Sequence, residues 1–131
     1  MSAEYTFTCN LCDLTLSAWT DGNPYIEHPP GTRQHFYHPS EKQQIADIAK
    51  SILGREPTEE DCDAILRNYA GNEPDHVCRE CHQVSRIDLR KDPRACRHCG
   101  ATTVEKVLDL GGKKCACCDG VFSAGDPTAI S

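Results

Sequence analysis

Cys78-Arg-Glu-Cys81, followed after fourteen residues by Cys96-Arg-His-Cys99, is the stretch that decides the fold of this chain. Each Cys-x-x-Cys pair can form a tight knuckle that points two thiolates at one metal ion. Two knuckles that face each other complete the tetrahedral shell of a structural metal site. The spacing therefore predicts one site with four ligands: Cys78, Cys81, Cys96 and Cys99.

Strand-like segments follow both knuckles of this stretch. Residues 83–89 alternate between apolar and polar side chains, residues 90–93 read as a turn, and residues 102–108 read as a returning strand. This order of knuckle, strand, turn, knuckle and strand resembles the zinc-ribbon superfamily over about residues 76–108. The resemblance implies a zinc-stapled β module. Members of that superfamily bind nucleic acid, bind proteins or brace a larger fold, so the resemblance names no single function.

Composition also favours metal staples. The chain has 131 residues, of which 38 % are hydrophobic and 6 % aromatic, with eight Pro, nine Gly and ten Cys. So few apolar side chains build only a thin core, and bound metal is the usual remedy in small domains. No secretory signal and no membrane-spanning run is visible, so we expect a reducing, cytoplasmic setting in which paired cysteines bind metal more often than they form disulfides.

Two more Cys-x-x-Cys pairs lie near the ends of the chain, Cys9 with Cys12 and Cys115 with Cys118. Strands are expected on either side of the first of these pairs, at residues 4–8 and 14–19. A second four-cysteine site would join the ends and leave Cys117 as the odd thiol. In an alternative arrangement, His35 and His38 join the first pair instead. We expect two Zn²⁺ ions, with iron as a weaker candidate, since rubredoxin-type sites use the same knuckles. The second set of ligands is Cys9, Cys12, Cys115 and Cys118.

The stretch Gly111-Gly-Lys-Lys-Cys115 with Cys118 resembles the C-terminal knuckle of uncharacterised bacterial multi-zinc-ribbon proteins. Lys113 and Lys114, just ahead of this knuckle, would favour thiolate over thiol. One further motif match is misleading. Cys78-Arg-Glu-Cys81-His82 fits the attachment pattern of c-type haem, but haem attachment needs export, so no haem is expected.

The middle of the chain reads as a loop followed by two helices. Residues 25–39 are rich in Pro and His and predict irregular structure. Apolar residues at helical spacing predict a helix over 41–53, started by a capping box at Ser40 and Gln43 and ended by Gly54. Thr58 caps a second helix that ends at Gly71, and Cys62 falls on its buried stripe.

The predicted fold class is a small α+β, metal-stapled protein in which zinc-ribbon β-hairpins carry an inserted helical hairpin. Four segments make one compact unit in this interpretation. They are an N-terminal half ribbon with the His- and Pro-rich loop (1–39), the helical hairpin (40–71), the central ribbon (72–110) and the C-terminal knuckle with its tail (111–131).

Charge divides the chain and bears on partners. Residues 1–75 hold five Lys/Arg and thirteen Asp/Glu, a net of −8, whereas residues 76–131 hold nine and seven, a net of +2. Arg86, Arg90 and Arg94 form a modest basic face that could contact phosphate. The leading hypothesis is a non-catalytic zinc-binding adaptor or regulatory module, with a protein partner first and nucleic acid second, because filled thiolate shells leave no open metal position.

Two other functions stay open from the sequence. The order of a Cys pair, a His-containing loop, an Asn and a second Cys pair is similar to the His-Asn-His nucleases. That resemblance implies that His35 or His38 activates water and that Asn72 or His82 completes a metal site. The run Cys115-Ala-Cys117-Cys118 instead suggests a thiol redox or metal-buffering protein.

Overall fold

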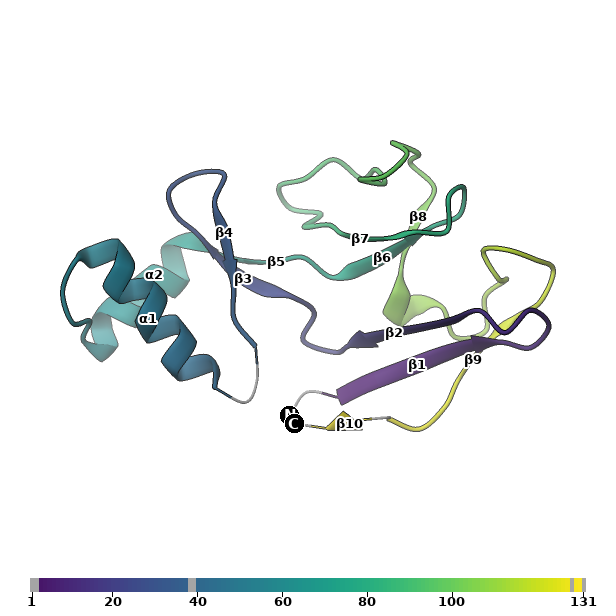
Figure 1. Ribbon diagram of the computed structural model, residues 1–131, viewed down its shortest axis with the longest axis horizontal. Helices are drawn as coiled ribbons and strands as arrows, with labels where there is room; N and C mark the ends of the chain where they lie inside the picture. The colour runs from purple at the N-terminus through teal and green to yellow at the C-terminus, as the bar shows by residue number, and fades with distance from the viewer. Residues whose placement is uncertain (1–2, 38–39, 128, 131) are drawn as a thin grey trace. The chain divides into compact units, whose positions relative to one another are not determined.

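The computed structural model describes residues 3–37, 40–127 and 129–130, and it has the predicted α+β class (Figure 1). Three small antiparallel sheets and two helices make up the described part of the chain. They form two compact units, one of residues 1–22 together with 73–131 and the other of residues 23–72. We call them the ribbon unit and the helical unit.

The first sheet of the ribbon unit brings the two ends of the chain together. Strand β1 (Ala3–Cys9) pairs with β2 (Thr15–Trp19) on one side and with β9 (Phe122–Ala124) and β10 (Ala129–Ile130) on the other (Figure 1). The pairing sets Cys9 opposite Phe122. The strands predicted at 4–8 and 14–19 are thus confirmed. Their core holds buried side chains of Phe7, Val107, Leu110 and Phe122.

The second sheet carries the central knuckles. Strand β6 (Asp75–Cys78) lies between β7 (Val84–Arg86) and β8 (Val104–Lys106), and a short 3-10 helix η1 (Val107–Asp109) follows β8. The predicted strands 83–89 and 102–108 are too long. Strand β7 ends early because Asp88 starts a turn, in which its carbonyl accepts from the N–H groups of Lys91 and Asp92. The central strand β6 was not predicted, since residues 72–75 read as a linker.

The helical unit begins with a hairpin where the sequence predicted a loop. Strands β3 (Pro24–Glu27) and β4 (Arg33–His35) pair with each other, and β5 (Ala70–Asn72) adds to β3. The prediction of irregular structure over 25–39 is therefore wrong for residues 25–27 and 33–35. Pro29, Pro30 and Gly31, whose φ is 89°, lie in the turn, which is closed by a hydrogen bond from His28 N–H to the Thr32 carbonyl (3.1 Å).

Helix α1 (Glu41–Leu53) has the predicted bounds and ends at Gly54, which adopts φ 73°. The predicted capping box is wrong, because the Ser40 side chain makes no capping hydrogen bond. Gln44 ties down this end instead: its Oε1 accepts from the Tyr37 N–H (2.9 Å) and its Nε2 donates to the Tyr37 carbonyl (2.8 Å).

Helix α2 (Glu59–Tyr69) starts as predicted, since Thr58 forms a full capping box with Asp61. It ends two residues before Gly71, because the chain passes directly into β5. The helices pack on β3 around a core of Ile26, Phe36, Ile45, Ile48, Ala49 and Ile65, against which Cys62 is partly buried. No helix in the described ranges is long and apolar enough to span a bilayer.

Candidate metal centres

The central knuckles bring four sulfur atoms together at the end of the β6 sheet. The Sγ atoms of Cys78, Cys81, Cys96 and Cys99 all lie within 4.8 Å of one another. Cys78 is 3.6 Å from Cys99 and Cys81 is 3.5 Å from Cys96. Four sulfurs arranged tetrahedrally around an ion about 2.3 Å away would be about 3.8 Å apart. This central cluster therefore fits a single metal ion.

A terminal cluster of the same kind joins the two ends of the chain. The Sγ of Cys9 lies 3.5 Å from that of Cys118, and Cys12 lies 3.6 Å from Cys115. All four sulfurs lie within 4.8 Å of one another, so this cluster also fits one ion. The structure thus assembles the four cysteines of the preferred prediction. His35 belongs to neither cluster, and His38, the other alternative ligand, lies outside the described residues.

All four knuckles share one backbone turn. In each, the N–H of the first cysteine donates to the carbonyl of the residue five positions later. In three knuckles the residue directly after the second cysteine has a positive φ: Asp13 (62°), His82 (64°) and Gly100 (78°). The four bonds are Cys9 to Leu14 (2.9 Å), Cys78 to Gln83 (3.0 Å), Cys96 to Ala101 (2.7 Å) and Cys115 to Gly120 (2.8 Å). His82 is therefore a turn residue of the central cluster.

Backbone amides point at the first sulfur of every knuckle. The donors lie two residues after the cysteine, at 3.4 Å for Leu11, 3.3 Å for Glu80, 3.3 Å for His98 and 3.4 Å for Cys117. A hydrogen bond to the charged form of an acid favours that form. These amides consequently stabilise thiolates, which are the form of cysteine that binds metal.

The acidities of the thiols reflect this arrangement. The Leu11 amide lowers the pKa of Cys9 to about 6, against the effect of burial. Burial opposes ionisation of Cys96 as well, but the amides of Cys99 and His98 lower its pKa to about 6. The Leu14 amide acts on Cys12, yet neighbouring sulfurs raise its pKa to about 12. Each cluster thus contains one thiol that ionises readily beside another whose ionisation the neighbouring sulfurs oppose, and a bound divalent cation would offset that opposition.

The cysteines differ in exposure according to their place in the knuckle. The first of each pair (Cys9, Cys78, Cys96 and Cys115) is buried, whereas Cys12 and Cys99 are exposed. The buried sulfurs pack against hydrophobic side chains, such as Ile87 and Val104 in the central cluster. Four sulfur ligands fill a tetrahedral shell, so each cluster can hold an ion that ties strands together.

Gly120 is the tightest position beside the terminal cluster. A Cβ at this residue would meet the Cys9 Sγ at 2.5 Å and the Asn10 Oδ1 at 2.7 Å. We expect Gly120→Ala to displace Cys9 and to weaken metal binding at this cluster roughly tenfold, the size of an ordinary overpacking cost. Gly125→Ala is the matched control, because a Cβ there meets nothing within 4 Å. Competition with a chromophoric chelator measures both variants; equal affinities would contradict this role.

Other residues singled out from the sequence are held in structural contacts. The Arg94 guanidinium donates to the Val104 carbonyl (2.9 Å), and Arg86 lies 3.8 Å from the Asp75 carboxylate, whereas Arg90 is exposed. The His35 ring stacks with that of Tyr37, at 6.2 Å between centroids. The Asn72 Oδ1 accepts from the Asn23 N–H (2.9 Å). None of the described histidines belongs to either cysteine cluster.

Cys117 is exposed beside the terminal cluster but outside it. Lys113 and Lys114 were expected to favour thiolate over thiol in this knuckle, but the pKa values of Cys117 and Cys118 are both raised. Partial desolvation and the charge of Cys115 raise the pKa of the Cys117 thiol. The lysines are engaged with carboxylates, at 3.9 Å to Glu105 for Lys113 and 3.2 Å to Asp119 for Lys114.

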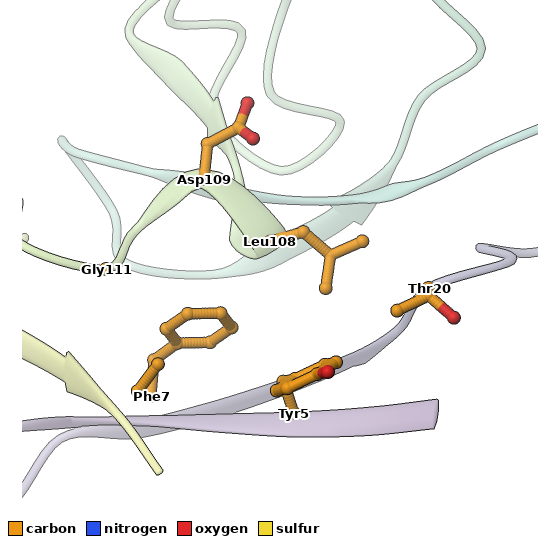
Figure 2. Close-up of a pocket in the computed structure, with 7 residues that line it drawn as sticks. Tyr5, Phe7, Thr20, Leu108, Asp109 and Gly111 are labelled. Carbon is orange, nitrogen blue, oxygen red and sulfur yellow. The ribbon is translucent and has the colours of Figure 1, made fainter. Parts of the chain in front are cut away.

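The ribbon unit also has a hollow of about 400 Å³ between β1 and η1. The rings of Tyr5 and Phe7 form one wall and Leu108 forms the other, with Thr20, Gly111 and Ala124 at the edges. Figure 2 shows Leu108 directed toward the two rings and the Asp109 carboxylate directed away from them. The walls of this hollow are thus mainly apolar.

Comparison of the chain with family models, with curated proteins and with solved structures found no match in any of the three.

Proposed function

We propose that the protein is a zinc-braced interaction module without catalytic activity, and that its helical unit binds a protein partner. The observation that carries the proposal is the composition of the two clusters, each of which offers four cysteine sulfurs to one ion. A catalytic zinc site keeps one position open for water or substrate, and a four-thiolate site has none. Thiolates at tetrahedral spacing favour Zn²⁺, and iron is the alternative metal.

A groove in the helical unit supports a protein partner. It has a volume of about 500 Å³ and lies between α1 and α2. Its floor is formed by Ile45, Cys62 and Leu66. Its rim carries the carboxylates of Glu41, Glu59 and Asp63, against the single cation Lys42. An apolar floor with an acidic rim is complementary to an amphipathic helix that presents an aliphatic side chain flanked by lysine or arginine.

Nucleic acid is the second candidate partner, and the described contacts support it less. Phosphate binding needs cationic side chains that are free to meet the backbone of DNA or RNA. Arg94 is bound to a backbone carbonyl and Arg97 lies 2.9 Å from the Asp92 carboxylate. The acidic charge of the whole chain, −6, also disfavours approach to a polyanion.

The enzymatic alternative is a metal-dependent nuclease of the His-Asn-His type. Two of its four candidate residues serve other roles in the described structure: His82 forms a knuckle turn and Asn72 binds the Asn23 backbone. The redox alternative depends on Cys117, whose raised pKa disfavours a reactive thiolate.

The groove is tested with two synthetic amphipathic helical peptides that share one leucine stripe and carry either lysine or glutamate on the polar face. We expect the lysine peptide to bind, and Glu59→Lys to weaken binding about fivefold, since an attraction at the rim becomes a repulsion. Glu60→Lys is the matched control: it makes the same charge change in the first turn of α2, but Glu60 does not line the groove.

Fluorescence anisotropy of the labelled peptides gives the dissociation constants. Equal binding of the two peptides, or equal loss in both variants, would contradict the groove. Binding of duplex DNA that is lost on charge reversal of Arg86, Arg90 and Arg94, and that falls steeply with salt, would favour the second candidate partner instead.

A further inference from the structure

One strand of the ribbon unit serves both metal clusters. Side chains alternate between the two faces of a β-strand, so neighbouring residues point in opposite directions. In β6, Val77 is fully buried in the core that contains Cys9 and Cys115. The next residue, Cys78, is fully buried in the core that contains Cys96. The packing around the two clusters is therefore linked through adjacent residues.

Arg79, the residue directly after Cys78, reaches from the central cluster to the terminal one. Its backbone N–H donates to the Thr103 carbonyl (2.9 Å) within the central ribbon. Its guanidinium Nη1 donates to the carbonyls of Lys114 (2.7 Å) and Cys115 (3.1 Å). Cys115 is itself a member of the terminal cluster. A single side chain thus connects a knuckle of one cluster to a knuckle of the other.

Glu105 on β8 holds that guanidinium in place. Its Oε1 accepts from Arg79 Nε and its Oε2 accepts from Arg79 Nη2, both at 2.9 Å. A bidentate ion pair of this kind fixes the plane of the guanidinium as well as its position. The pair is also partly buried, with 24 % and 28 % of the two side chains exposed. The remaining donor, Nη1, is therefore aimed at the terminal knuckle.

We propose that Arg79 couples the two metal clusters, so that an ion bound at one raises the affinity of the other. This inference rests on the proposed metal occupancy. An ion at the central cluster orders the knuckle that carries Arg79, and an ion at the terminal cluster orders the carbonyls that Arg79 binds. Each ion thereby lowers the ordering cost that the other must overcome, which is the condition for positive coupling between sites.

Arg97 provides a matched control for Arg79. It occupies the same position in the second knuckle, directly after Cys96, and is an arginine as well. Its guanidinium contacts the Arg86 carbonyl (2.7 Å) and the Asp92 carboxylate (2.9 Å). None of the described contacts of the Arg97 guanidinium reaches the terminal knuckle, so Arg97 should not transmit coupling.

The test measures the Zn²⁺ affinity of the central cluster by competition with a chelator in six proteins: the wild type, Arg79→Ala and Arg97→Ala, each with and without Cys115→Ser. We expect Cys115→Ser to weaken the central cluster roughly tenfold in the wild-type background, within the usual range of coupling between sites. In the Arg79→Ala background the same change should have less than about a twofold effect, whereas in Arg97→Ala it should remain roughly tenfold.

A second measurement needs no cysteine variant. Native mass spectra taken during Zn²⁺ titration should show mainly metal-free and two-ion wild type, and a prominent one-ion species for Arg79→Ala. A one-ion species equally abundant in both proteins, or an undiminished effect of Cys115→Ser in the Arg79→Ala background, would overturn the coupling. Wild type that binds no Zn²⁺ at all would instead refute the proposed metal occupancy.

Discussion

A strong chelator under reducing conditions is expected to unfold the ribbon unit while the helical unit stays folded. Binding of structural zinc contributes about 10–16 kcal/mol in small domains, whereas a whole domain is stable by only about 5–15 kcal/mol. Both clusters found among the described residues lie in the ribbon unit, and the helices have a separate core around Ile48 and Ala49. Amide NMR signals of β1 and β6 should therefore collapse, and helical signals should persist.

The control for this experiment is the same chelator already saturated with Zn²⁺, which should leave every signal in place. Adding Zn²⁺ back to the metal-free protein should restore the dispersed signals of β1 and β6. A ribbon unit that remains cooperatively folded without metal would contradict the account. Loss of helical signals at the same chelator concentration would show that the two units do not fold separately.

Cys115→Ser is expected to reduce the bound metal from two ions to one and to release the two ends of the chain. The Cys115 sulfur lies 3.6 Å from that of Cys12, so the change removes one of the four ligands that hold β1 near the C-terminal knuckle. Loss of a structural metal is among the largest effects a single substitution can have. Native mass spectrometry gives the number of ions, and protease sensitivity reports the released ends.

Cys117→Ser is the matched control for this variant. It replaces a cysteine of the same knuckle that is exposed and outside the cluster. It should retain two ions and the protease resistance of the wild type. Retention of two ions by Cys115→Ser would require another ligand in its place and would argue against the four-cysteine terminal cluster.

The two clusters could be predicted because their chemistry is local. A Cys-x-x-Cys pair specifies its own turn, and a pair alone cannot fill a tetrahedral shell, so four pairs imply two sites. The spacing alone could not identify the other two ligands of the site that contains Cys9 and Cys12, because His35 is also near this pair in the sequence. The pairing of β1 with β9 decides it, and that pairing joins residues more than a hundred positions apart.

The bounds of helix α1 could be predicted from the helical spacing of its apolar residues and from Gly54 at its end. The hairpin of β3 and β4 was missed because Pro29, Pro30 and Gly31 were read as breaking the whole segment, although they occupy only its turn. Strand β6 was missed because Asp75 and His76 follow a proline and carry no apolar alternation. Both errors concern three- or four-residue strands that are fixed by their neighbours and not by their own composition.

The contacts of Arg79 could not be predicted at all. Its sequence position shows only that it follows Cys78, and the basic residues of the central ribbon read together as one surface that could contact phosphate. In the structure these arginines have different hydrogen-bond partners: Arg79 binds Glu105 and the Cys115 carbonyl, while Arg94 binds the Val104 carbonyl. Such long-range hydrogen bonds depend on the assembled fold and leave no local signal.

X-ray absorption at the zinc edge of the purified wild-type protein tests the central claim most directly. The account predicts two ions per chain, each with four sulfur neighbours at about 2.3 Å and no nitrogen or oxygen ligand. Protein that is folded without metal, or a shell in which histidine nitrogen or water oxygen replaces sulfur, would contradict it.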